Sequence, residues 1–560
     1  MAQLSLPGGA LPARRLDTDR LHLALLGAAV LVPLCLFVVL PLAGILKLSF
    51  DTPTGFGFGN YARYFAGAKF ARVAGNSFSV AASATVITVA LAYAYAYALS
   101  RSVQKWRPLF TAVALLPLYA PSLVQALGIL FLFGRNGLVN RAFDLDIDIY
   151  GFRGIVISDV FYSFPHAFLI LSAALAYGDA RLYESARMLG ARSARVFRSV
   201  TLPATRYGVI SAVFVVFTIV ITDFGNPMVI GGDYSVLATE IYNQVSGQGN
   251  MELGAVIGVV LLVPAALAVL VERWISRHSH ASIGGGSQPL QVVPSARRDR
   301  VAFAYLCLVA LSIAAVVGVV AIASVVTLWP YNMQMSLRHY RFEVQNGLQP
   351  LWTSIVVSLI AALVGVVATV AAACVARKLK SAWAQALYFL SVLPAAVPGM
   401  VLGLGYILIF NDPRNPLEVL YGSLAILAIC NVYHYHAQGF LIATTAMNQV
   451  SRVFDEASTC LGAGVLHTLR KVVLPIIAPA LLSIGVFFFV RSMVTLSAVI
   501  FLVTPATQLA AVSVLLLDDS GNQNQAAAYS VCIMAVVALA LLVLRATRAL
   551  LARRAIPATR

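Results

Sequence analysis

Long apolar runs dominate this chain of 560 residues and limit the folds that it can adopt. Twelve such runs are separated by short segments that hold nearly all of the charged residues. An apolar run of about 20 residues crosses the hydrocarbon core of a bilayer as a helix. A helix also satisfies every backbone hydrogen bond within lipid. The sequence therefore predicts an all-α polytopic membrane protein with about 12 transmembrane helices.

The runs fall into two sets of six. They cover about 21–47, 78–100, 109–133, 154–177, 206–231 and 252–271, and then 301–328, 353–376, 384–410, 422–444, 476–503 and 526–547. Hydrophobic residues make up 60% of the chain and charged residues only 11%. Soluble chains carry about 25% charged residues. This composition excludes intrinsic disorder and a coiled coil, and six cysteines without a CxxC pair exclude a disulfide scaffold.

The basic residues predict the orientation of the chain. With the N-terminus inside, 28 of the 39 Lys and Arg residues fall in inside segments and 10 in outside segments. Cytoplasmic loops of membrane proteins collect Lys and Arg. We therefore expect both termini in the cytoplasm. The net charge of +17 is explained by topology, and no nucleic-acid partner is needed.

The two halves contain an internal repeat. Five residues in the loop after the fourth span recur after the tenth span, each displaced by 272 positions: Glu184 and Glu456, Gly190 and Gly462, Val200 and Val472, Leu202 and Leu474, Pro203 and Pro475. Pro117, Pro121, Gly128 and Phe133 match Pro394, Pro398, Gly405 and Phe410 with a displacement of 277. Repeats with even numbers of spans have one orientation and pack about an axis along the membrane normal.

This repeat predicts two six-span domains. The first is expected at 1–273, with a cytoplasmic loop at 180–203, and the second at 301–560, with the corresponding loop at 452–475. Between them, 274–300 contains a Gly-Gly-Gly-Ser run, a proline and three arginines, which is linker composition.

The paired loops carry a family resemblance. Each loop has a Glu beside small residues, then a Gly, and then an aliphatic residue shortly before Leu-Pro. This pattern resembles the signature loop of permease subunits of binding-protein-dependent ABC importers. Ser185 and Ser458 replace alanines of that pattern. Two copies in one chain resemble the fused permeases of the ferric-iron, thiamine and 2-aminoethylphosphonate branches. The resemblance implies two parallel six-span repeats of the type I ABC importer permease fold.

The resemblance also implies a role for the loops. Short helices at 180–189 and 452–461 would dock into grooves on two ATPase subunits, and a glycine would cap each helix. The residues that this assigns to ATPase coupling are Glu184, Ala186, Gly190, Leu202 and Pro203, and Glu456, Ala457, Gly462, Leu474 and Pro475. Alternatively, each glutamate only complements the dipole of its helix.

The chain lacks a GxxxxGK[ST] phosphate loop and any catalytic or metal-ligand constellation. We therefore expect a non-enzymatic subunit that binds no cofactor, with ATP used by partner subunits. The expected partners are two copies of a cytoplasmic ABC ATPase, a periplasmic or extracellular substrate-binding protein, and membrane lipid. The expected location is the bacterial inner membrane. A twelve-span secondary transporter and a channel or membrane-embedded enzyme are the competing classes, and neither needs the paired loops.

Two charged residues in the spans are candidates for the substrate path. Arg491 lies inside an apolar run and Asp223 closes the equivalent run of the first half. The two could meet across the pseudo-twofold axis, as a structural or gating ion pair or with Arg491 contacting an anionic substrate. We expect His434 and His436 to be packed or pore-lining residues and not metal ligands, because a spacing of two places them on different faces of a helix. The outer segment from Asp223 resembles the 2-aminoethylphosphonate group most. The alternative substrates are ferric iron, whose permease group shares Asp-Phe-Gly, and thiamine.

Overall fold

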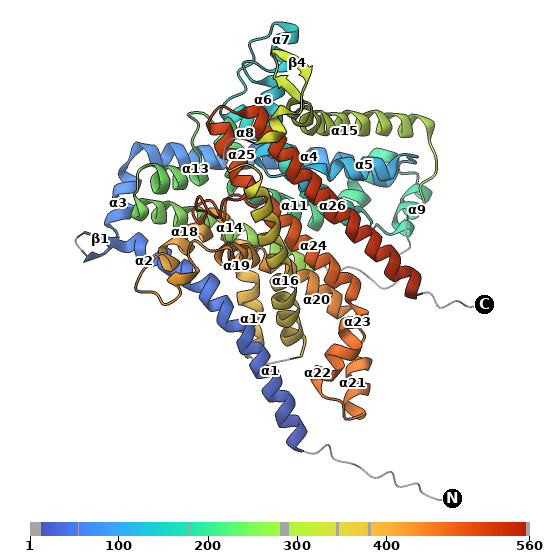
Figure 1. Ribbon diagram of the computed structural model, residues 1–560. Helices are drawn as coiled ribbons and strands as arrows, with labels where there is room; N and C mark the ends of the chain where they lie inside the picture. The colour runs from blue at the N-terminus through green and yellow to red at the C-terminus, as the bar shows by residue number, and fades with distance from the viewer. Residues whose placement is uncertain are drawn as a thin grey trace, which may run out of the picture.

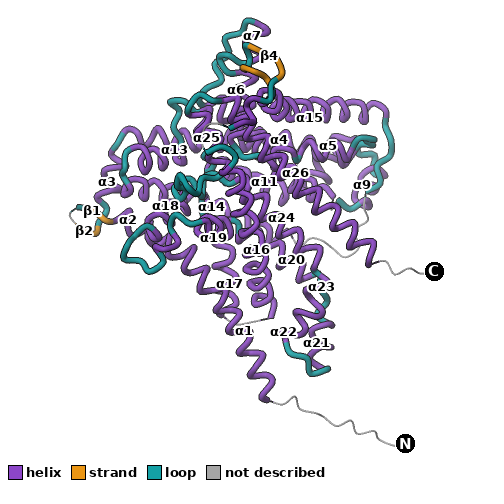
Figure 2. Tube along the Cα trace, viewed as in Figure 1, coloured by secondary structure: helices purple, strands orange, loops and turns teal. Residues whose placement is uncertain are grey.

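The computed structural model describes residues 13–53, 55–176, 178–279, 290–342, 346–378 and 382–555. This part of the chain is mostly helical, as predicted (Figures 1 and 2). The strands form two small antiparallel hairpins, β1 (Asp51–Thr52) with β2 (Gly55–Phe56) and β3 (Val326–Leu328) with β4 (Asn332–Met335). The glycine-rich stretch of the expected linker, 280–289, lies outside the described residues.

Nine helical segments of the described chain are long and apolar enough to cross a membrane, and each matches a predicted span in order. They are built from α1 (Ala13–Leu34), η1 (Cys35–Val39) and α2 (Leu40–Phe50); α4 (Ala68–Arg101); α6 (Leu123–Phe133) and α7 (Leu138–Phe143); α8 (Phe152–Ala176); α10 (Ser193–Val196), η3 (Phe197–Thr201) and α11 (Leu202–Ile221); α14 (Met251–Ser279); α15 (Ala296–Ser324); α16 (Gln349–Lys378); and α26 (Gln523–Ala555).

The other three predicted spans, 384–410, 422–444 and 476–503, do not each form one straight helix in the structure. A bend of 109° separates α17 (Ala382–Val392) and η7 (Leu393–Ala396) from α18 (Gly399–Phe410). A bend of 78° separates α22 (Val465–Thr468), η9 (Leu469–Val473) and α23 (Leu474–Ile476) from α24 (Ala478–Val494). The predicted span 422–444 is two short helices, α19 (Leu424–His434) and α20 (His436–Asn448). In the third predicted span, α5 (Arg107–Ala114) and η2 (Leu116–Tyr119) precede α6. The matched prolines Pro117 and Pro394 lie in η2 and η7, because proline cannot continue a helical hydrogen-bond ladder.

The remaining helices are short connectors. They are α3 (Gly59–Ala66), α9 (Ala180–Met188), α12 (Gly225–Ile230), α13 (Leu237–Tyr242), η4 (Asn243–Gly247), η6 (Arg338–Arg341), η8 (Glu418–Leu420), α21 (Val453–Cys460) and α25 (Ala510–Asp519). In Figure 1, α9 and the end of α26 lie at the right, and α21 and the start of α1 lie at the bottom. The α3 helix and the β1–β2 hairpin lie at the left, and α7 and the β3–β4 hairpin lie at the top, so the two groups occupy opposite sides of the molecule.

The first span of each half packs on the other half. The α1–α2 segment contacts α16, α17 and α18, whereas α15 contacts α4, α5 and α6. The repeat glycines make these contacts possible. A Cβ on Gly128 of α6 would lie 2.3 Å from the Val316 carbonyl oxygen of α15, and one on Gly405 of α18 would lie 2.8 Å from the Pro41 carbonyl oxygen of α2. Small residues allow such close approach of membrane helices. Each half of the sequence therefore packs its first span against helices of the other half.

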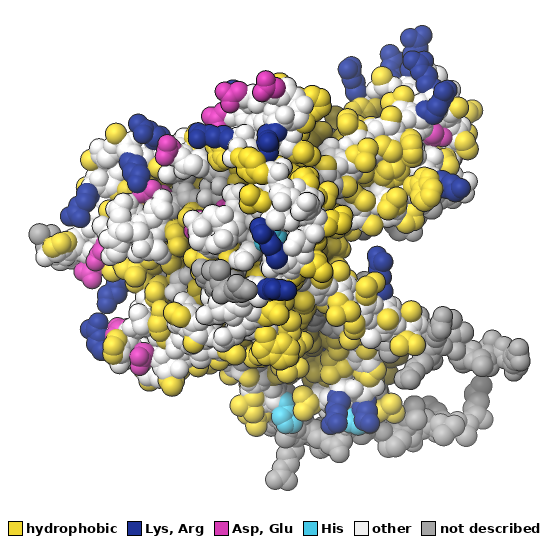
Figure 3. Space-filling view, turned by 45° about the horizontal axis from the view of Figure 1, so that its top comes forward, with side chains coloured by type: hydrophobic (Ala, Val, Ile, Leu, Met, Phe, Trp, Pro, Cys, Tyr) yellow, Lys and Arg dark blue, Asp and Glu magenta, His cyan; other side chains and the backbone are white. Residues whose placement is uncertain are grey.

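Apolar side chains cover broad lateral areas of the surface, and basic side chains gather at one projecting end (Figure 3). Leu308 and Leu311 of α15 are 67% and 68% exposed, and Leu363 of α16 is 71% exposed. Lipid rather than water is the solvent that suits such faces. The exposed leucines thus extend the sequence prediction of a membrane protein to particular helix faces.

Candidate functional site

The helices break where the two halves meet. The α11 helix ends at Ile221 and its counterpart α24 ends at Val494, and irregular backbone follows both. Asp223 and Phe224 after α11 are 7% and 1% exposed, and Leu496 after α24 is 5% exposed. Non-helical backbone at membrane depth is tolerated where it is buried in protein or lines a cavity. The breaks therefore mark the centre of the molecule as a candidate site.

A small cavity of about 40 Å³ lies at these breaks and is lined by both halves. Tyr162 and Asp223 come from the first half, and Tyr435 and Arg491 from the second. The two charged residues singled out in the sequence thus line one cavity. Among the described residues, the recorded ion pairs do not include one between Asp223 and Arg491. The Arg491 guanidinium lies instead 4.7 Å from the centre of the Tyr435 ring, a cation–π contact.

Asp223 belongs to a buried polar cluster. Its Oδ2 accepts a hydrogen bond from the Asn226 amide nitrogen at 2.9 Å, and Asn226 Nδ2 donates to Asp159 Oδ1 at 2.8 Å. Asp159 of α8 is fully buried. Our sequence reasoning missed Asp159, although a lone carboxylate in an apolar span was a usable signal. Its counterpart at the displacement of 272 is Asn431, whose Nδ2 donates to Ser492 Oγ at 2.7 Å.

A larger chamber of about 590 Å³ adjoins the small cavity, and it too is lined from both halves. Tyr162 and Arg491 line both spaces, so they form the partition between them. His166, Glu272 and Gln438 add polar groups to the walls of the chamber. The chamber is mainly apolar, and its few polar groups lie on walls that both halves contribute, as a passage between the halves would require.

The histidines of α19 and α20 lie close to this region. His436 is fully buried, with its ring stacked near those of Tyr433 and Phe440 at 5.8 and 6.3 Å. In the residues that the structure describes, no group of three or more His, Cys, Asp or Glu side chains could hold a metal ion.

The paired loops form short helices with the same C-terminal turn. Helix α9 ends at Met188 and α21 ends at Cys460. Gly190 and Gly462 follow with φ of 74° and 70°, in the left-handed region that glycine adopts without strain. In the first loop, the Gly190 amide donates to the Arg187 carbonyl and the Ala191 amide to the Ala186 carbonyl. The second loop repeats both bonds, which together are a Schellman motif.

Each short helix is anchored to the end of a long span by the residue before the repeat glutamate, with different chemistry in the two halves. Tyr183 is buried under Arg101 of α4, which donates to its hydroxyl at 3.0 Å and lies 4.9 Å from its ring centre. In the second half this position is Asp455, which pairs with Arg377 at 2.8 Å and Lys378 at 2.6 Å. Burial alone would raise the pKa of Asp455, but these two cations hold it below its ordinary value.

The repeat glutamates themselves are exposed. Glu456 lies in the first turn of α21, where a carboxylate complements the helix dipole. Glu184 lies beyond the first turn of α9, and Asp179 caps that helix by accepting from the Arg181 amide at 3.1 Å. The dipole interpretation therefore suits only Glu456.

The other loop residues place an apolar tip on each helix. Leu189 and its repeat counterpart Leu461 are both 86% exposed. Ala186 and Leu474 are half-buried, and Leu202, Pro203, Ala457 and Pro475 are exposed. The π-helical turns η3 and η9 precede the two Leu-Pro pairs, so each proline sits in the first turn of α11 or α23 within a longer helical rod.

Comparison with known proteins identifies these repeats. Residues 75–280 and 365–556 each match the family model described as "Binding-protein-dependent transport system inner membrane component". The chain belongs to this family. It is a multi-pass inner-membrane permease of the ABC importer class, with two copies of the family unit, and the family is that of a non-catalytic membrane subunit. Each match begins after the span that packs on the other half.

The permease is similar to curated proteins of other bacteria. It is 31% identical over 445 residues to a ferric transport system permease protein of Actinobacillus pleuropneumoniae, covering 76% of this chain and 64% of that protein. It is 32% identical over 411 residues to a putative ferric transport system permease protein of Haemophilus influenzae, covering 70% and 64%. It is 31% identical over 140 residues to a thiamine transport system permease protein of Brucella suis, covering 24% and 26%. The chain thus spans 64% of the length of the two ferric relatives it matches.

Proposed function

We propose that this permease is the membrane subunit of an ATP-driven importer of ferric iron. The two relatives named for ferric transport support this substrate, which was the alternative interpretation of the sequence. They favour it over 2-aminoethylphosphonate, and the thiamine relative is matched over only 24% of the chain. The substrate passes between the two halves as they alternate between outward and inward access.

The observation that carries the proposal is the pair of anchored helices, α9 and α21, on one side of the molecule. Each presents a leucine, Leu189 or Leu461, that is 86% exposed. Exposed apolar tips on rigidly held helices suit insertion into partner grooves. Two ATPase subunits would dock here, one on each helix, and their movement would reach the spans through Arg101 and Asp455. The repeat residues from Glu184 to Pro203 and from Glu456 to Pro475 would take part in this coupling.

The remaining assignments follow from the same arrangement. A periplasmic or extracellular binding protein would deliver the substrate on the opposite side, where α3, α7 and the hairpins lie (Figure 1). Both termini would be cytoplasmic, the lateral surface would face membrane lipid, and the chain would bind no cofactor of its own. A secondary transporter remains the competing class, in which a proton gradient and not ATP drives uptake.

Arg491, which lies between the two cavities, suggests the charge of the species that is transported. A guanidinium between the small cavity and the chamber repels a bare cation and attracts an anion. Iron would therefore pass Arg491 as a negatively charged complex. The competing role for Arg491 is structural, through the Tyr435 ring. An Arg491→Ala variant that assembles and imports iron at the normal rate would exclude contact with the substrate.

Reconstituted transport tests the proposal. The permease is purified with the ATPase that accompanies it, placed in liposomes with its binding protein, and supplied with labelled ferric iron or 2-aminoethylphosphonate. We expect ATP-dependent iron uptake that a Walker-lysine substitution in the ATPase abolishes. Leu189→Asp with Leu461→Asp should release the ATPase, whereas Leu337→Asp, at an outer position that is 72% exposed, should not. Uptake driven by a proton gradient without ATP would overturn the proposal.

A further inference from the structure

A groove between the two halves lies beside the proposed substrate path. It has a volume of about 890 Å³ and runs between α14 of the first half and α16, α17 and η7 of the second. Its walls are mainly apolar, with Ala266 and Leu270 on the α14 side and Phe389 and Leu393 on the other. The groove opens to the surface, because Leu270 and Phe389 are 58% and 61% exposed. In a membrane protein, such an opening faces the acyl chains of the bilayer.

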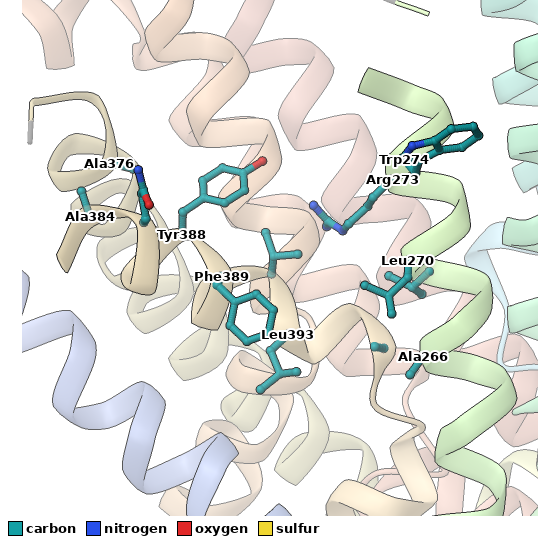
Figure 4. A pocket seen from close by; sticks show the side chains of 13 residues that line it. Ala266, Leu270, Arg273, Trp274, Ala376, Ala384, Tyr388, Phe389 and Leu393 are labelled. Carbon is teal, nitrogen blue, oxygen red and sulfur yellow. The ribbon is translucent and has the colours of Figure 1, made fainter. Parts of the chain in front are cut away.

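The polar groups of the groove are gathered at one end. Arg273 from α14 and Tyr388 from α17 extend toward each other across the groove, and Ala266 and Leu393 lie at the other end (Figure 4). Gln385 also lines the groove, one turn before Phe389 on the same helix. A long apolar trough with a guanidinium at one end has the polarity of a phospholipid.

The cationic end lies on the side of the coupling helices. Ala376 lines the groove near the end of α16, where Lys378 pairs with Asp455 of α21. Trp274, next to Arg273, is 66% exposed, and tryptophan is enriched at membrane–water interfaces. The charge distribution predicts that this side is cytoplasmic, and the cytoplasmic leaflet carries anionic lipids.

We propose that this groove binds one anionic phospholipid, with its phosphate at Arg273 and an acyl chain along the apolar walls. A charge-assisted bond between guanidinium and phosphate would hold the headgroup. A headgroup without a cation would be preferred, because the choline cation of phosphatidylcholine would be repelled by Arg273. A free phosphate would use only the cationic end and leave the apolar walls empty. Because Arg273 also lines the central chamber, the lipid would brace the wall of that chamber between α14 and η7. The inference does not depend on which substrate is transported.

Native mass spectrometry of the permease–ATPase complex tests this site. The complex is released from nanodiscs of phosphatidylcholine with or without phosphatidylglycerol, and retained lipids are counted. We expect one phosphatidylglycerol to be retained by the wild type, and Arg273→Gln to weaken its binding roughly tenfold, about 1.4 kcal/mol. Arg414→Gln is the matched control, because that side chain is 91% exposed in an outer loop and pairs with Asp412.

A second variant separates the lipid from a free anion. Ala266→Phe narrows the apolar end and keeps Arg273, so it should also lose the lipid, and thermal unfolding in phosphatidylcholine should show that it still folds. Retention of phosphatidylglycerol by Arg273→Gln at the wild-type level would overturn the proposal. Equal retention of phosphatidylcholine would do so too, as would full displacement of the lipid by inorganic phosphate.

Discussion

The exchange of first spans between the halves makes a quantitative prediction for Gly128→Ala. The Cβ of alanine would lie 2.3 Å from the Val316 carbonyl oxygen, against 3.4 Å for ordinary contact, so α6 and α15 must separate by about 1.1 Å. The obstacle is backbone and cannot rotate away. Overpacking of this kind costs about 1–3 kcal/mol, and the better helix propensity of alanine returns at most about 1 kcal/mol. Gly405→Ala faces a shortfall of 0.6 Å at the Pro41 carbonyl oxygen and should cost less.

The assay is reversible unfolding of the purified permease in mixed micelles, with transport measured on the same preparations. Gly318→Ala is the matched control, since it lies on α15 with no atom within 4 Å of the added Cβ. We expect the control to be neutral or slightly stabilising, and Gly128→Ala to be destabilising with reduced transport. If Gly128→Ala were as stable as Gly318→Ala, the close packing of α6 on α15 would be refuted.

Three further predictions concern charged groups. Asp455→Asn should destabilise α21 by about 1–3 kcal/mol, because loss of the carboxylate leaves the partly buried Arg377 and Lys378 without their anion. Hydrogen exchange of residues 453–460 measures this loss. Because the pKa of Asp455 is lowered in the folded protein, this stabilisation is complete above the ordinary aspartate value of about 3.9 and is lost as the pH falls below it. A pH titration of the same exchange should therefore show α21 equally protected at neutral and mildly acidic pH. Asp159→Asn should change stability by less than about 1 kcal/mol, because the oxygen of the new amide still accepts from Asn226 Nδ2. Asp159→Leu removes this acceptor and should cost about 1–3 kcal/mol in thermal unfolding.

The local turn at the end of each coupling helix could be predicted from sequence, because its cause is local. A left-handed C-cap favours glycine, so Gly190 and Gly462 predicted where α9 and α21 end. The anchors could not be predicted. Tyr183 and Asp455 occupy one repeat position with unrelated side chains, and only their contacts with Arg101 and with Arg377 and Lys378 reveal a shared role.

The central site was predictable only in part. Arg491 and Asp223 stood out because charges are costly in lipid, and the structure places both on one cavity. The sequence did not show that, among the described residues, Arg491 contacts the Tyr435 ring and forms no ion pair with Asp223. The breaks in the spans were also missed, since apolar runs record burial in lipid or protein and not whether the helix continues.

A helical membrane protein of two similar halves could be predicted from the chain, because run length, charge sidedness and the fixed displacement of repeat residues are visible in its residues. How the halves pack on each other could be seen only in three dimensions. Gly128 and Gly405 were visible as matched residues, but close packing on a span from the opposite half is a contact between distant segments. Hydrophobic periodicity does not predict such a contact, because a lipid-facing helix is apolar whichever helix it packs against.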